Sequence, residues 1–200
     1  MELEIKGVRV RVSFLFVSMA ALYILLTPAA VSAFFLLAIT AHETGHLIAM
    51  FSLGEPPASI ELRSFGIRIT RRSPLIPPRR ELVILAAGPA VNLLLSALFF
   101  LASRLPGAEP LLTASSINLL VALFNLFPTG CLDGGGLMRC LLGIALSPGA
   151  ARRVYLTVAW LFLLPLAAFG AYMLIVPPHS PSLLITAVYL TVTLLRDIGR

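Results

Sequence analysis

Residues 29 to 53 read AAVSAFFLLAITAHETGHLIAMFSL, an apolar run that one polar stretch interrupts. About 20 apolar residues are enough for a helix to cross a bilayer, so the run predicts a transmembrane helix. The interruption, HETGH at residues 42–46, would place three ionisable groups at membrane depth. Such groups are costly in lipid, so their presence indicates a functional site.

The spacing of HETGH is that of a metal-binding helix. His42 and His46 are four residues apart, so on a helix both imidazoles project from one face and can share one ion. Glu43 points in a neighbouring direction, which suits it to accept a proton from a water on that ion. The pattern therefore predicts a zinc site with Glu43 as general base.

The composition predicts an all-α membrane protein. The 200 residues are 58% hydrophobic and only 12% charged, against about 25% charged in soluble domains. We expect one membrane-embedded domain, residues 1–200, with about six transmembrane helices. The expected spans are residues 12–26, 29–53, 82–103, 111–127, 154–176 and 183–195. The small residues 31–33 also allow a signal-peptide cleavage site, although acidic residues precede that run.

The basic residues predict the orientation. With six spans, fourteen of the fifteen Lys and Arg residues fall on one side, and only Arg104 falls on the other. Positive loops face the cytoplasm, so both termini are expected there. Because the arginines flank apolar runs, we attribute the net charge of +6 to membrane topology and expect no nucleic-acid partner.

Residues 59–71 differ in pattern from the apolar runs. Ile60, Leu62, Ile67 and Ile69 alternate with polar or charged residues, which is the period of a β-strand. With a turn near residues 64–66, the segment predicts a small hairpin at the cytoplasmic face. An edge strand of that hairpin could pair with an extended substrate. A plain basic surface loop is the alternative.

A catalytic zinc site uses three protein ligands, so a third one is needed. His179 follows two prolines in a loop expected on the far face. Of the nine acidic residues, seven lie in loops or at span ends, which leaves Glu43 and Asp133 within apolar sequence. With Glu43 assigned as base, elimination favours Asp133, and Cys131 is the rival ligand.

The surroundings of Asp133 support this assignment. Residues 125–136 read NLFPTGCLDGGG, and an unbroken helix does not run through such a mixture of proline and glycine. Irregular backbone at membrane depth is tolerated where it lines a cavity or is buried in protein. The alternative is an ordinary interfacial turn at the end of a span.

Three motifs together resemble the site-2 protease family of intramembrane metalloproteases. They are HETGH at residues 42–46, GPAVN at 88–92 and NLFPTGCLDGG at 125–135. The resemblance implies that His42, His46 and Asp133 bind zinc, that Glu43 is the base, and that Asn92 lies near the scissile carbonyl. An inter-helix hydrogen bond is the alternative role for Asn92. Small size and six spans resemble the sporulation type, which processes the precursor of sigma-K.

The sequence departs from the family pattern at two positions. Cys131 stands where proline is frequent, and Gly136 stands where arginine is common. Neither change removes a catalytic atom, but both weaken the inference to the sporulation type.

The expected function is hydrolysis of a peptide bond in or near the membrane segment of a membrane-tethered protein, such as a sigma-factor precursor. The expected partners are this substrate, the lipid bilayer and, as an open question, an inhibitory membrane protein. A zinc transporter or zinc-binding scaffold is the alternative, because it would share the three ligands without needing Glu43. The oligomeric state is not predicted.

Overall fold

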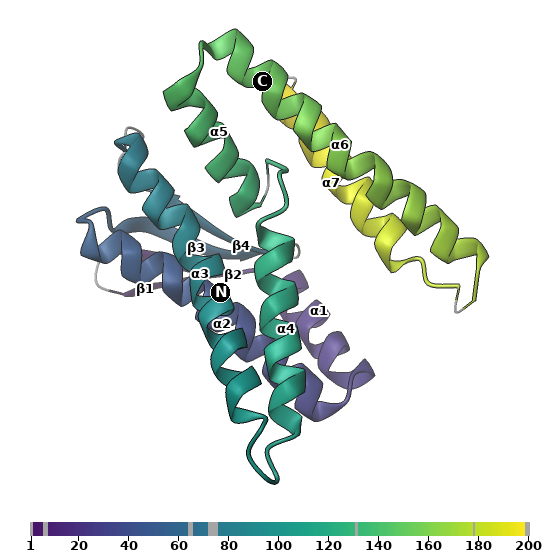
Figure 1. Cartoon of the computed structure of the whole chain (residues 1–200). Coiled ribbons are helices and arrows are strands. Elements are labelled where there is room, and N and C mark those ends of the chain that lie inside the picture. The colour runs from purple at the N-terminus through teal and green to yellow at the C-terminus, as the bar shows by residue number, and fades with distance from the viewer. Residues whose placement is uncertain are drawn as a thin grey trace. The chain divides into compact units, whose positions relative to one another are not determined.

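The structure is a computed structural model that describes residues 2–5, 8–63, 66–71, 76–130, 132–177 and 179–198. In these ranges it contains seven helices and a four-stranded sheet (Figure 1). The chain divides into two compact units, Met1–Ala122 and Leu123–Arg200.

The sheet of the first unit has the order β1-β2-β3-β4. Its strands are β1 (Glu2–Ile5), β2 (Val8–Val12), β3 (Pro57–Arg63) and β4 (Gly66–Arg71). The predicted hairpin is confirmed as the antiparallel pair β3–β4, in which Ile60 lies opposite Ile69. β1 and β2 form a second antiparallel hairpin, and β2 runs parallel to β3. The prediction lacks these N-terminal strands, although residues 2–5 and 8–12 alternate charged and apolar residues. The parallel pairing of β2 with β3 has no local signal, because a parallel pair forms only across a long connection, here two helices.

Four helices complete the first unit, and prolines mark the start of most of them. They are α1 (Phe14–Leu26), α2 (Ala29–Ser52), α3 (Pro78–Ala102) and α4 (Pro110–Asn125). Pro28 separates α1 from α2. Because proline has no backbone N–H, it cannot donate a hydrogen bond that would continue α1. Met50 of α2, one turn after His46, forms a small buried core with Ile84 of α3, and Ile69 of β4 packs against it. This core fixes the end of α2 against both α3 and the sheet.

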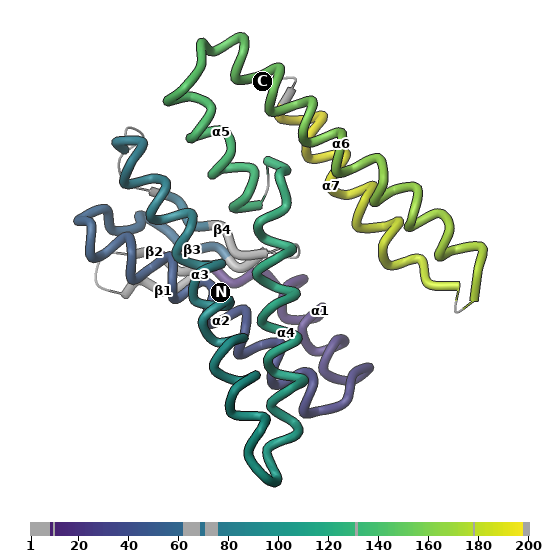
Figure 2. The backbone as a smooth tube through the Cα atoms, in the orientation of Figure 1, coloured from purple at the N-terminus to yellow at the C-terminus, as the bar shows by residue number. Residues whose placement is uncertain are grey.

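The second unit consists of α5 (Asp133–Ala145), α6 (Pro148–Ile175) and α7 (Ser182–Ile198). The helices α6 and α7 lie side by side (Figure 2). Tyr155 and Leu163 of α6 share a buried core with Leu190 and Leu194 of α7. Other α6 side chains, such as Ile175, with 76% of its surface exposed, face outward. Large apolar side chains exposed along a long helix are typical of a lipid-facing surface.

Among the described residues, three helices are long and apolar enough to cross a membrane, judged by length and composition: α2, α3 and α6. α1 and α4 are shorter apolar helices, and α7 has 17 residues. The helices thus occupy the expected positions in the chain, whereas the number six remains a prediction.

Candidate metal centre

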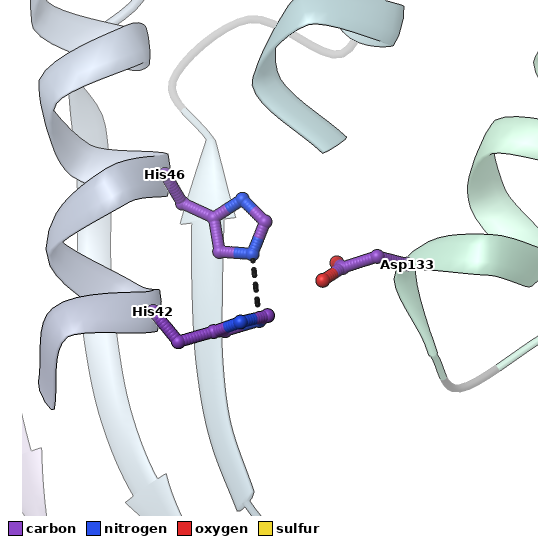
Figure 3. Close-up of side chains that lie close together, drawn as sticks. All are labelled: His42, His46 and Asp133. Carbon is purple, nitrogen blue, oxygen red and sulfur yellow. Dashed lines mark hydrogen bonds between the residues drawn. The ribbon is translucent and has the colours of Figure 1, made fainter. Parts of the chain in front are cut away.

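The two histidines of HETGH lie together on α2, as the spacing predicts. Both are buried, with 4% and 6% of their surface exposed for His42 and His46. Their rings meet edge to face, and their Nε2 atoms lie 3.1 Å apart (Figure 3). Glu43, the next residue on the helix, is half-buried. The helix therefore presents two imidazole nitrogens to one point in a largely dry environment.

The second ring nitrogen of His46 settles which of its nitrogens carries the proton. Nδ1 of His46 lies 2.7 Å from the backbone carbonyl oxygen of Ile84 on α3. A carbonyl oxygen only accepts hydrogen bonds, so Nδ1 of His46 is the donor. In the neutral ring this leaves the lone pair on Nε2, the nitrogen that faces His42.

The tautomer of His42 follows from the orientation of Asn92 on α3. The amide nitrogen of Asn92 donates to the carbonyl oxygen of Ala38 at 3.0 Å, which only accepts. The amide oxygen of Asn92 therefore faces Nδ1 of His42, 2.7 Å away, and Nδ1 must donate to it. The neutral His42 ring, too, then carries its lone pair on Nε2.

The two Nε2 atoms lie 3.1 Å apart, so in neutral rings two nitrogen lone pairs face each other. A cation between them, either a proton or a metal ion, removes the repulsion. Two nitrogens about 2.0–2.1 Å from a tetrahedral zinc ion would stand about 3.3–3.4 Å apart, close to the observed separation. The outer nitrogens of both imidazoles are held by oxygen acceptors, the arrangement usual for metal-bound histidine. This pair therefore fits zinc.

Asp133 belongs to the second unit, where it is the first residue of α5 (Figure 3). The expected break in the helix is confirmed: α4 ends at Asn125, and α5 begins at Asp133. The break is shorter than predicted, because residues 134–136 lie in the first turn of α5. The position gives the carboxylate the favourable field of a helix N-terminus. Cys131, the rival ligand, lies outside the described residues.

Gly134 shows how the turn before Asp133 is packed. A Cβ at this position would overlap the carbonyl oxygen of Leu126 and lie 2.8 Å from its Cα. Only glycine therefore lets the start of α5 approach the end of the preceding segment so closely.

The other candidate ligand, His179, lies where the sequence predicts it. It occupies the loop between α6 and α7 and is exposed, and its Nδ1 lies 3.2 Å from the carbonyl oxygen of Leu174.

Comparison with known proteins agrees with this chemistry. The chain is 35% identical over 150 residues to a Mycobacterium tuberculosis protein named "Putative zinc metalloprotease Rip3". It is 32% identical over 109 residues to "Putative zinc metalloprotease sll0528" of Synechocystis. The solved site-2 protease from Methanocaldococcus jannaschii matches 98% of this chain with a TM-score of 0.68 at 22% identity, and 94% of that protein is covered. The chain is a relative of zinc metalloproteases and has the site-2 protease fold. No family model matches it.

The sequence relatives are considerably longer than this site-2 protease-like chain. The matches include 68% and 52% of the chain but only 38% of the Mycobacterium protein and 29% of the Synechocystis protein. Together with three membrane-length helices, the comparisons support an integral membrane protein that is similar to proteins named "Putative zinc metalloprotease" and has the fold of the solved site-2 protease.

One polar residue of the metal centre has no role in the sequence-based prediction. Asn118 on α4 is buried, and its amide oxygen accepts a hydrogen bond from the amide nitrogen of Asn92 at 2.8 Å. The sequence does indicate a special role for Asn118, because this polar residue interrupts the apolar run of residues 111–127. A buried amide in an apolar helix calls for a hydrogen-bond partner. The sequence, however, does not say which residue provides it.

Proposed function

We propose that this chain is the core of an intramembrane zinc metalloprotease of the site-2 type. The observation that supports the proposal best is the pair of Nε2 lone pairs, 3.1 Å apart, on a membrane-length helix. Two neutral histidines held this way can share a divalent cation, and the similarity to proteins named "Putative zinc metalloprotease" favours zinc.

We propose Asp133 as the third protein ligand. A carboxylate leaves the site with three protein ligands and an open fourth position, as catalytic zinc sites require. Asp133 begins a helix directly after a break in an apolar region, and it is one of the two acids there. The other acid, Glu43, neighbours His42 on α2 and is available for proton transfer.

When bound, zinc would act as a Lewis acid that brings the pKa of a water ligand toward neutrality. Glu43 would accept the proton of the attacking water and return it to the amine that leaves when the peptide bond breaks. His42 and His46 would hold the ion, and their outer nitrogens would keep both rings in place. The buried position of the rings limits access of bulk water to the site.

The two roles of Asn92 that the sequence leaves open predict different contacts. All three hydrogen bonds of its amide group run to His42, Ala38 and Asn118. These contacts support a positioning role on His42. A role at the scissile carbonyl would require the amide nitrogen to give up its present acceptors.

The proposed substrate is a membrane-tethered protein that is unwound near the cleavage site. β4 ends the described sheet and could pair with an extended segment by strand addition. If it does, Ile67→Pro should reduce cleavage while bound zinc is unchanged. A sigma-factor precursor as substrate, and a role in sporulation, follow from the sequence resemblance alone.

The test compares the wild-type chain with Glu43→Gln in cells that co-express membrane-tethered candidate substrates. Zinc content of the purified proteins is measured by elemental analysis, and cleavage is followed by the size of the substrate. We expect equal zinc in both proteins and cleavage only with the wild type. Cleavage by Glu43→Gln would contradict the protease proposal. If neither protein cleaves any substrate and both raise the zinc content of the cells equally, the result would favour a transporter.

A further inference from the structure

We infer that Asn118 is a positioning residue for His42 and acts on it through Asn92. The inference rests on the proposed metal site, since its purpose is to keep Nε2 of His42 available to an ion. The three side chains come from α4, α3 and α2 in turn. They form a continuous line of hydrogen bonds within the first unit.

The direction of each hydrogen bond in this line follows from the carbonyl oxygen of Ala114, which Asn118 contacts at the end away from His42. The amide nitrogen of Asn118 donates to the carbonyl oxygen of Ala114 at 2.9 Å, and a carbonyl oxygen only accepts. The amide oxygen of Asn118 is thereby turned toward Asn92 and accepts from its amide nitrogen at 2.8 Å.

The same reasoning carries through to the histidine. The amide nitrogen of Asn92 has two acceptors, Asn118 and the carbonyl oxygen of Ala38, so its amide oxygen has one orientation available. That oxygen accepts from Nδ1 of His42 at 2.7 Å. A flip of Asn92 would place its amide oxygen against two other oxygens, so the network selects one tautomer of His42.

Burial makes this selection strong. Asn92 has no exposed surface, and Asn118 has 2% exposed. A buried amide group left without a partner costs about 1–3 kcal/mol, because water does not replace the lost bond. Loss of the oxygen of Asn118 removes one of the two acceptors that orient Asn92, so only the carbonyl oxygen of Ala38 then opposes the flipped amide and the flipped form becomes more populated.

The pair Ser96 and Ser115 offers a matched control on the same two helices. The hydroxyl of Ser115 donates to the backbone oxygen of Ser96 at 2.8 Å, and the two hydroxyl oxygens lie 3.2 Å apart. Ser115 precedes Asn118 by one helical turn and is also buried. It thus contributes to the same helix contact without a bond to Asn92.

The experiment measures the tautomer of His42 directly in the metal-free full chain. Histidine-labelled protein in detergent micelles is examined by two-bond proton–nitrogen correlation NMR, and the three histidines of the chain make assignment simple. The variants are Asn118→Leu, which removes both polar atoms, and Asn118→Asp, whose neutral acid can donate to Ala114 and still accept from Asn92. Ser115→Ala is the control. Zinc affinity is measured by competition with a chelator.

We expect Asn118→Leu to lose the pure Nδ1–H form of His42 and to bind zinc about 10-fold more weakly, the low end of the usual effect of an outer-shell partner. Asn118→Asp and Ser115→Ala should keep both properties. An unchanged tautomer in Asn118→Leu would overturn the inference, as would an equal loss in Ser115→Ala. If Asn118→Leu does not fold, a changed His42 tautomer in folded Asn118→Asp overturns it, and an unchanged one supports it. A wild type that binds no zinc would contradict the proposed function, while the NMR result would still test the inference.

Discussion

Gly88 on α3 lies against the ring of His46 on α2, with no space for a side chain between them. A Cβ at Gly88 would overlap Nε2 of His46 and lie 2.8 Å from Cε1 of His42. The edges of the two imidazole rings thus occupy the volume that any other residue at position 88 would need. Small residues at helix contacts usually let backbones approach one another. Here the glycine also makes room for the two imidazoles.

Gly88→Ala is expected to weaken zinc binding, because its methyl group displaces the imidazoles from their common point. Zinc affinity of the purified variant, measured by chelator competition, tests this. Gly143→Ala is the control, since nothing lies within 4 Å of a Cβ at Gly143 on α5. That substitution should leave zinc binding unchanged and stabilise the helix by up to about 1 kcal/mol. Equal zinc affinity in both variants would contradict the packing argument.

Asp133→Asn should lower zinc affinity by more than the roughly 10–100-fold that loss of an outer-shell partner costs, because it removes the proposed direct ligand. The helix content, followed by circular dichroism, should not change, since an asparagine is also tolerated at a helix start. Asp197→Asn is the control, because Asp197 pairs with Arg139 near the end of α7. Wild-type zinc affinity in Asp133→Asn would exclude Asp133 as a ligand and would leave Cys131 as the candidate for the third ligand.

Arg139 connects α5 with both the turn before Asp133 and the end of α7. It donates to the carbonyl oxygen of Gly130 at 3.1 Å and to the carboxylate of Asp197 at 3.0 Å. Both side chains of the ion pair are partly exposed, at 45% and 36%. A double-mutant cycle of Arg139→Gln with Asp197→Asn should therefore yield a coupling free energy of only about 0.2–1 kcal/mol. Chemical denaturation measures it, and a coupling well above this range would show that the pair is shielded from water.

The predicted orientation can be tested by labelling single cysteines with a membrane-impermeant thiol reagent in intact cells. The background replaces Cys131 and Cys140 with serine. Arg79→Cys, beside the start of α3, should be protected, because the arginine-rich side is expected to face the cytoplasm. Glu109→Cys, just before α4, should be labelled from outside. The reverse result would contradict the orientation drawn from the distribution of arginines.

The positions of the helices could be predicted because their signals are local. Pro28, Pro77 and Pro148 stand at or beside the starts of α2, α3 and α6. The hairpin of β3 and β4 could also be predicted, because its strands are neighbours in sequence and alternate with a period of two. The strands β1 and β2 carry the same local alternation, whereas the parallel pairing of β2 with β3 could not be predicted, since it spans two helices.

In the candidate metal centre, too, the local features could be predicted from the sequence and the distant contacts could not. The helical repeat alone places His42 and His46 on one face of α2, so five letters of sequence are enough to predict a shared ion. The state of each ring depends on groups far along the chain. Ile84 is 38 residues from His46, and Asn92 is 50 residues from His42. No periodic pattern specifies such a pairing, because it arises from how α3 and α4 pack beside α2.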